Sequence, residues 1–441
     1  MRGIRFLVLL LIAIPLGWYA YHDSKKGAVD DTPKKDKVFS VETDKIDELE
    51  IKSESGDRTT LGKKGNDWQI MQPVSGAADQ STVSGITSNL SSLEIQRVID
   101  ENPGNLKEFG LASPRIEVAY KSGGQQHRLQ VGDKTPTGSD LYAKLADGKR
   151  VFLIPAYLES TFNHGTFDLR DKTVLKVDRE RLDKLEVVVD KRTERFEKKD
   201  GDWIIAEPAV GKAEFSALDN LVSRISSLQM KSIVNDAGDL KKYGLEKPAV
   251  TVRIGSGSSL ASLLIGSTAE TGTVFARDAA RPAVFTIESS LLDDLKKDVS
   301  EYRLKDLFDA RSFNTTRVEI LRNGQTATFE KTKTKDKDGK EQEKWRQTAP
   351  AAKDVDGAKV EALVSAASAA RATGFVDQAA KTGLDKPELT VSLTYDEGKQ
   401  ERVTFARSGG AAYASRAGSP GAAKIDASTI DSIVKALEDV K

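Results

Sequence analysis

Short stretches of alternating apolar and polar residues recur along the chain. The segments 49–51 and 185–189 have the period of two that predicts half-buried strands. Turn residues follow each of them, and a further turn at 65–67 or 200–202 leads into a strand that carries a tryptophan. The pattern therefore predicts antiparallel hairpins at the start of similar segments.

The apolar spacing changes to a helical period after each tryptophan strand. Four apolar residues of the first copy fall three or four positions apart: Val83, Ile86, Leu90 and Leu93. This spacing predicts a helix over 79–93 with Asp79 as its N-cap. By the same argument we expect helices over 213–228 and 355–372, the last capped by Asp354.

Two independent sequence features recur along the chain at one long interval. Tryptophans at Trp68, Trp203 and Trp345 lie 135 and 142 residues apart, and each is followed five residues later by a proline. The motif Gly-Leu-x-x-Pro begins at Gly110, Gly244 and Gly383, with steps of 134 and 139 residues. Such self-similarity is the signature of a tandem repeat, so we expect three copies of one module.

The third copy diverges from the other two. The strand ending Leu129-Gln-Val-Gly132 is matched by Leu263-Leu-Ile-Gly266, but only by a degraded version near 403–405 in which the glycine has slipped. The charged run 331–344 lengthens the second step and is interpreted as an extended hairpin tip.

Two short motifs mark the ends of the first two copies. Residues 167–172 and 302–305 align when Leu169 is matched with Leu304. A short closing helix such as 289–297 precedes the second motif. Because two motifs serve three copies, we expect them to join consecutive modules.

These patterns predict an α+β fold of three tandem modules, each an antiparallel sheet with helices. The expected boundaries are 38–172, 173–310 and 311–441, the last being the divergent copy. A chain of 441 residues is long enough for about three domains of ordinary size. Residues 24–37 are polar and charged, and they are interpreted as a flexible stalk.

The N-terminal segment has the features of a membrane anchor. Arg2 and Arg5 precede an apolar run of 18 residues, 4–21, which as a helix would be about 27 Å long. We therefore expect residues 1–23 to form a transmembrane signal-anchor, with a cleaved signal peptide as the alternative. The protein is then predicted to be a single-pass protein of the bacterial inner membrane with its C-terminal domains outside the cytoplasm.

Composition excludes several functional classes. Lys+Arg and Asp+Glu both number 67, and the charges are intermixed, so we expect no nucleic-acid partner. The absence of cysteine excludes disulfides, thiolate nucleophiles and Cys-based zinc sites. No histidines lie at metal-ligand spacing, and no Gly-x-Ser-x-Gly or phosphate-loop motif occurs. No catalytic, cofactor-binding or metal-binding residue is therefore predicted, and no cofactor.

The tryptophans and the Gly-Leu-x-x-Pro motif that recur in the three copies can be interpreted as structural or as functional. The repeated indoles could be exposed and stack on sugars or bases, but a fixed distance to the following proline favours aromatic residues of the core. Gly-Leu-x-x-Pro is interpreted as a backbone turn rather than part of a site. His127 is expected on a strand, at the position of Ala261 and Gln400 in the other copies.

Together the motifs resemble a known bacterial family. Asp-Trp-x-Ile-x-x-Pro at 67–73 and 202–208, Lys-x-Phe/Tyr-Gly-Leu-x-x-Pro at 107–114 and 241–248, and Leu-Arg-Asp-Lys at 169–172 are similar to those of the domain-of-unknown-function family 4340. The resemblance implies a single-pass membrane protein whose gene lies beside an ABC-type permease, an ATPase and an auxiliary protein resembling those of gliding motility. It implies no catalytic residues.

The functional hypothesis is a non-enzymatic, extracytoplasmic scaffold or accessory protein of an ABC-type export or cell-envelope complex. Its expected partners are the membrane and a permease or envelope protein. A glycan- or lipid-binding protein that uses the clefts between modules is the first alternative. An envelope hydrolase without a recognisable motif is the second.

Overall fold

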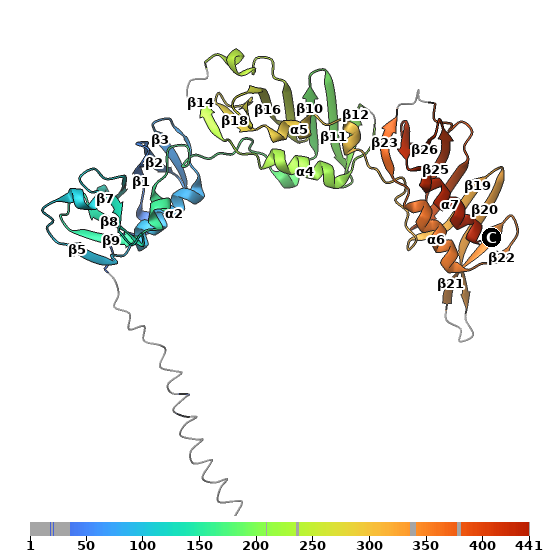
Figure 1. Cartoon of the computed structure of the whole chain (residues 1–441), viewed down its shortest axis with the longest axis horizontal. Helices are drawn as coiled ribbons and strands as arrows, with labels where there is room; N and C mark the ends of the chain where they lie inside the picture. The colour runs from blue at the N-terminus through green and yellow to red at the C-terminus, as the bar shows by residue number, and fades with distance from the viewer. Residues whose placement is uncertain are drawn as a thin grey trace, which may run out of the picture. The chain divides into compact units, whose positions relative to one another are not determined.

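The computed structural model describes Trp18, Tyr21 and residues 36–208, 210–234, 238–335, 341–376 and 381–440. The described chain contains three antiparallel sheets of nine strands each (Figure 1). The chain divides into two compact units, Met1–Asp171 with the first sheet and Lys172–Lys441 with the other two. The predicted α+β repeat is confirmed, and each sheet lies inside one predicted module, although the exact module boundaries stay a prediction.

The first sheet and its helices belong to residues 43–162. Its strands are β1 (Glu48–Lys52), β2 (Arg58–Lys64), β3 (Asp67–Gln72), β4 (Gly76–Ala77), β5 (Arg97–Asp100), β6 (Ile116–Ser122), β7 (Gln125–Lys134), β8 (Asp140–Leu145) and β9 (Val151–Pro155). Its helices are α2 (Gln80–Ser92), α3 (Leu158–Phe162) and the 3₁₀ turns η1 (Thr43–Lys45) and η2 (Leu106–Phe109).

The second sheet repeats this series. Its strands are β10 (Lys184–Val189), β11 (Arg192–Lys199), β12 (Asp202–Glu207), β13 (Gly211–Lys212), β14 (Ser232–Val234), β15 (Val250–Ser256), β16 (Ser259–Thr268), β17 (Thr273–Asp278) and β18 (Val284–Glu288). Its helices are α4 (Phe215–Ser226), α5 (Ser290–Leu295) and the 3₁₀ turns η3 (Arg179–Arg181), η4 (Leu240–Tyr243) and η5 (Val299–Tyr302).

The third sheet has the same number of strands and a longer final helix. Its strands are β19 (Thr315–Arg322), β20 (Gln325–Lys335), β21 (Glu341–Ala349), β22 (Lys353–Asp354), β23 (Ala372–Val376), β24 (Leu389–Tyr395), β25 (Lys399–Ser408), β26 (Ala411–Arg416) and β27 (Ala422–Ile425). Its helices are α6 (Gly357–Ser368) and α7 (Ala427–Val440).

All three sheets have one strand order, which in the first is β4-β3-β2-β1-β6-β7-β8-β9-β5. The chain runs outward from β1 to the edge strand β4, and the segment through α2 then leads to the opposite edge at β5. Strand β6 returns to the centre beside β1, and the meander β6 to β9 ends against β5. Each module is therefore two meanders joined by a single central pairing.

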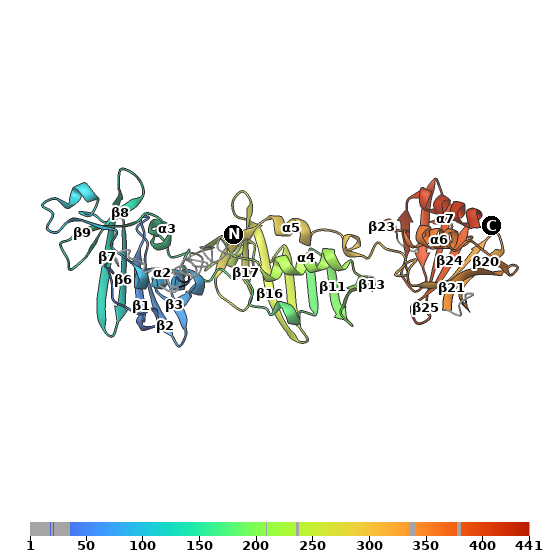
Figure 2. The ribbon, with the colours of Figure 1, turned by 90° about the horizontal axis from the view of Figure 1, so that it is seen from below.

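One face of each sheet is buried by the helices. In the first sheet, alternate residues such as Leu49, Ile51 and Leu61 are inaccessible to solvent. In the second, α4 covers the sheet with Leu218, Leu221, Val222 and Ile225 (Figure 2). Burying each such side chain stabilises the fold by about 1.5–3 kcal/mol, so the period-two strands and the amphipathic helix require one another.

The helix predictions hold with two corrections. Asp79 caps α2 as predicted, its carboxylate accepting a hydrogen bond from the backbone N–H of Thr82 at 2.8 Å. Asp354 is not an N-cap, because it lies in the edge strand β22, and Asp356 caps α6 instead. The predicted helix 355–372 is too long at its C-terminal end, because Ala372 begins β23.

The third module differs from the others in two places. The charged run is an extended hairpin as predicted, with β20 and β21 paired as far as Lys335 and Glu341. The glycine has not slipped, since Ala406 follows Phe405 at the register position of Gly132 and Gly266. The glycine was replaced rather than moved.

The joining motifs align differently from the sequence prediction. The carbonyl of Leu169 accepts a hydrogen bond from Asp79 N–H, and the equivalent bond in the second module goes from Glu214 N–H to the carbonyl of Tyr302. Arg170 and Arg303 then form equivalent bridges. Leu169 therefore corresponds to Tyr302 and not to Leu304, because backbone pairing rather than the shared leucine sets the register.

Most of the predicted anchor 1–23 and the predicted stalk 24–37 lie outside the described residues. Among the helices that the structure does describe, none combines the length and the apolar character needed to cross a membrane.

Candidate functional site

The three repeated tryptophans belong to the cores. Trp68, Trp203 and Trp345 are only 4%, 2% and 5% exposed, which confirms the interpretation as core aromatics. A lysine on the neighbouring strand places its ammonium over each ring, at 5.3, 5.8 and 5.2 Å from the centroid. Buried indoles covered in this way cannot stack on a ligand.

Each proline that follows a tryptophan strand has a cis peptide bond, at Gln72-Pro73, Glu207-Pro208 and Ala349-Pro350. In every copy the ladder shifts register just before this bond. The fixed distance between tryptophan and proline therefore has a structural origin in each sheet.

The Gly-Leu-x-x-Pro motif is a backbone turn, as predicted. Gly110 and Gly244 end the 3₁₀ turns η2 and η4 with φ of +68°, a conformation that favours glycine. The following leucines, Leu111 and Leu245, are each only 3% exposed. The motif therefore has a structural role in these two modules.

His127 lies beside two aromatic side chains, Phe39 and Tyr120. The ring of His127 stacks on Tyr120 with 5.1 Å between centroids. Its counterpart in the third module is Glu401 rather than the predicted Gln400, because Glu401 pairs with Leu393 where His127 pairs with Tyr120. His22 lies outside the described residues, and within them no cluster of three His, Asp or Glu side chains could hold a metal ion.

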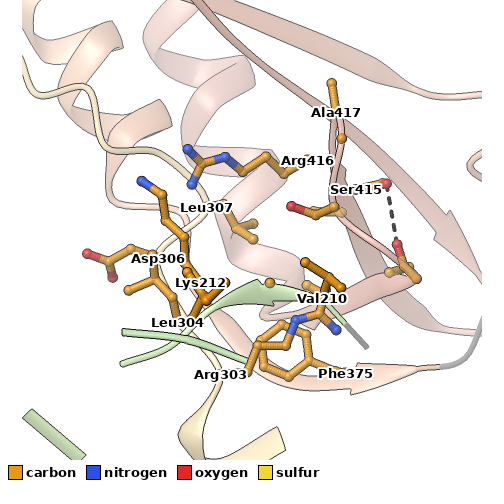
Figure 3. A pocket seen from close by; sticks show the side chains of 18 residues that line it. Val210, Lys212, Arg303, Leu304, Asp306, Leu307, Phe375, Ser415, Arg416 and Ala417 are labelled. Carbon is orange, nitrogen blue, oxygen red and sulfur yellow. Dashed lines mark hydrogen bonds between the residues drawn. The ribbon is translucent and has the colours of Figure 1, made fainter. Parts of the chain in front are cut away.

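A cavity of about 330 Å³ lies inside the second unit, where the second module meets the third (Figure 3). One wall comes from β12, β13 and the junction after η5, and the other from β23, β26, β27 and the loop between the last two. The basic residues on its walls are Lys212, Arg303 and Arg416, and the acidic one is Asp306. It is the best candidate for a functional site among the described residues.

A buried ion network supports the far side of this cavity. The carboxylate of Glu401 is 5% exposed and accepts hydrogen bonds from the N–H groups of Asp309 and Ala310 at 2.8 and 3.1 Å. It also accepts from the hydroxyl of Tyr395 at 3.1 Å and from Arg416 at 2.5 Å. These four donors offset the cost of removing the carboxylate from water.

The same network crosses between the two modules. Asp309 binds Arg416 at 3.0 Å and also binds Lys212 of β13. Burial alone would raise the pKa of Asp309, but the two cationic hydrogen-bond donors outweigh it and lower that pKa to about 2. Lys212 and Arg416 are thus already neutralised by protein carboxylates.

Arg303 is held differently. Its guanidinium lies over the ring of Phe375, 4.2 Å from the centroid, and Nη2 donates to the carbonyl of Pro420 at 2.5 Å. No carboxylate among the described residues forms an ion pair with it, and burial lowers its pKa. This cation lines the cavity and has donors that no acceptor among the described residues binds, so the arrangement can bind an anion.

The sequence did not identify this site. Arg303 belongs to the joining motif, where it was treated as a structural mark, and Phe375 lies 72 positions later in an edge strand. The arginine that occurs in both joining motifs, at Arg170 and Arg303, could have indicated the site. An arginine in a half-buried segment needs a partner for its charge.

The comparison with solved structures gives only neighbours of low similarity. The DNA polymerase sliding clamp from Pseudomonas aeruginosa is 8% identical over 87% of this chain and 91% of its own, with a TM-score of 0.15. The structure of this clamp with ligand is 7% identical over 88% and 92% of the two chains, again with a TM-score of 0.15. TM-scores at this level support no argument about function. No curated protein matches the sequence.

The family comparison is informative. One family model, described as a domain of unknown function, matches residues 68–210 and again residues 203–387. The two matches begin at Trp68 and Trp203, one structural period apart. They cover most of the chain and bear out the resemblance found in the motifs. The protein belongs to the DUF4340 family.

Proposed function

We propose that this protein is a non-catalytic scaffold of the bacterial cell envelope. Residues 1–23 would anchor it in the inner membrane, and the modules would lie outside the cytoplasm and bind a permease of an ABC-type export system or another envelope protein. Tethering would raise the local concentration of the partner, which strengthens binding without new contacts.

The observation that carries this proposal is the junction between the second and third modules. Its first half belongs to the second module, where Leu304 N–H donates to the carbonyl of Lys212 at 2.9 Å. Its second half belongs to the third, where the carbonyl of Lys305 accepts from Ala372 N–H at 2.7 Å. Adjacent residues are thus fixed in different modules, which favours a rigid pair over two freely moving domains.

Side chains reinforce the connection. Glu214 of the second module lies 3.5 Å from Arg371 of the third, and Lys212 pairs with Asp309. Exposed ion pairs contribute little individually, so the backbone pairing supplies the rigidity and the ion pairs add specificity. A rigid pair of modules supports a role in holding partners at a defined separation.

Site-specific photo-crosslinking tests the scaffold role. Phe313 and Tyr157 are large apolar residues that are 82% and 63% exposed, so a benzophenone amino acid can replace either without disturbing a core. Glu361, exposed on α6, is the matched control position. We expect crosslinking in intact cells at one of the two aromatic positions to capture a multi-spanning permease subunit.

Capture of neither a permease nor another envelope protein at either aromatic position would contradict the scaffold role, and so would equal capture at Glu361. A second candidate function is ligand binding by the second unit. The cavity beside Arg303 favours it specifically, and retention of a small anion or lipid by the purified protein would support it over the scaffold.

A further inference from the structure

We infer that the cavity between the second and third modules binds a small amphipathic organic anion. The ligand would place a carboxylate or phosphate against Arg303 and an apolar group against the cavity wall. This inference does not depend on the scaffold role, because it rests only on contacts inside the second unit.

Among the described residues around the cavity, one cation has no carboxylate partner. Asp309 pairs with both Lys212 and Arg416, and Arg416 pairs also with Glu401. The one acidic residue that lines the cavity, Asp306, lies 2.7 Å from Arg311 and 3.5 Å from Arg371. Arg303 therefore decides which charge the cavity accepts.

The orientation of Arg303 leaves its donors available. One face of the guanidinium covers Phe375 and Nη2 is bound to the carbonyl of Pro420. No acceptor among the described residues binds its Nε or Nη1, which are suited to a carboxylate or phosphate. Half-burying a cation without a counter-charge is costly, and an anionic ligand would recover part of that cost.

The rest of the lining is mainly apolar. Val210, Leu307, Phe375 and Ala423 contribute side chains to the walls, and Val210 is 65% exposed (Figure 3). A cavity of about 330 Å³ is at the lower end of the usual range for small-molecule sites. The ligand class is therefore an anion with one small apolar group, such as a ring or a short chain.

Calorimetric titration of the full chain in lipid nanodiscs tests this inference, with empty nanodiscs as the blank. The probes are benzoate and phenyl phosphate, which distinguish a carboxylate from a phosphate site. Benzyl alcohol and benzylamine are the neutral and cationic controls of similar shape. We expect one or both anions to bind saturably and neither control to do so.

Two variants test whether the anion binds at Arg303. Arg303→Gln should weaken anion binding about tenfold or more, because it removes a charge-assisted hydrogen bond. Arg253→Gln removes the same charge from the surface of β15 and should leave the affinity unchanged. Thermal unfolding of each variant shows whether the fold is retained.

A second pair of variants avoids the junction altogether. Val210 is mostly exposed, so Val210→Asp and Val210→Asn should both fold, and only the aspartate should weaken anion binding. The inference is overturned if neither anion binds at millimolar concentration. It is equally overturned if benzyl alcohol binds as well as benzoate, or if Val210→Asp and Val210→Asn bind alike.

Discussion

Gly266 packs so closely against the backbone carbonyl of Tyr243 that no Cβ would fit between them. Gly132 has the same relationship with the carbonyl of Phe109 in the first module. Both carbonyls belong to the last residue of a 3₁₀ turn, so the strand glycine permits the turn to lie against the sheet. Ala406 occupies this position in the third module, where the residues equivalent to the turn begin outside the described part of the chain.

Gly266→Ala is therefore expected to destabilise the second unit by about 1–3 kcal/mol, the usual cost of overpacking a core. Ala406→Gly should cost only about 0.5–1 kcal/mol, from the greater freedom of glycine in the unfolded chain. Differential scanning calorimetry of the full chain measures both. Equal costs would mean that the close approach at Tyr243 does not exclude a side chain.

Trp203→Ala should destabilise the second unit by about 3–5 kcal/mol, the usual range for removing a large buried aromatic residue. Trp203→Phe should cost less, because the indole nitrogen has no hydrogen-bond partner among the described residues. Calorimetric unfolding of the two variants distinguishes them. A nearly neutral alanine variant would place the indole at the surface and revive the stacking interpretation.

Glu401→Met should destabilise the third module by about 3–5 kcal/mol, because Arg416 and two backbone N–H groups would lose a buried acceptor. Adding Arg416→Met should cost less than it does in the otherwise unchanged protein, since one of the two carboxylates that Arg416 binds is then already absent. A double-mutant cycle measures this coupling.

The exposed pair of Arg317 and Glu330 is the control for that cycle. Glu330→Gln should change the free energy of unfolding by about 1 kcal/mol or less. Additive effects of Glu401→Met and Arg416→Met would contradict the proposed buried network.

Glu194 should make stability depend on pH. Its side chain is 3% exposed, and burial raises its pKa from 4.5 to about 7, with Arg192 offsetting only part of the effect. The folded state then binds more protons than the unfolded state between these values, so raising the pH lowers the free energy of unfolding across this window. Above about pH 7 this contribution should be constant.

Glu194→Gln should remove that dependence, and Glu194→Thr should do the same, because Thr59 occupies the equivalent register position in the first sheet. Unfolding temperatures at pH 5 and pH 8 measure the effect for each protein. If the variants retain the same difference between the two pH values as the original protein, Glu194 is not the group responsible.

Local sequence patterns predicted the repeat well, because the residues that recur have structural roles in every module. The tryptophans fill the cores, and the glycines of Gly-Leu-x-x-Pro have positive φ in all three modules. The sheet order could not be predicted in this way. It depends on the central pairing of strands such as β1 and β6, which are separated by four strands and the helix α2, and no local period encodes such a partner.

The candidate site was less predictable for the same reason. Glu401 and Arg303 were each misplaced by one or two positions, because the divergent third copy and the joining motifs were aligned on residue identity. Only backbone pairing shows that Glu401 occupies the position of His127. The cavity itself joins segments more than 200 residues apart along the sequence, which periodicity cannot bring together.

The junction from Tyr302 to Leu307 has no spare residue, because the second module holds its first three residues and the third module holds its last three. An insertion between Leu304 and Lys305 would leave the hydrogen bonds of both modules intact but would let the modules separate, whereas a longer hairpin such as β20–β21 would not affect the junction. Extra residues at a hairpin tip therefore extend one module, and extra residues at the junction would loosen the connection between two.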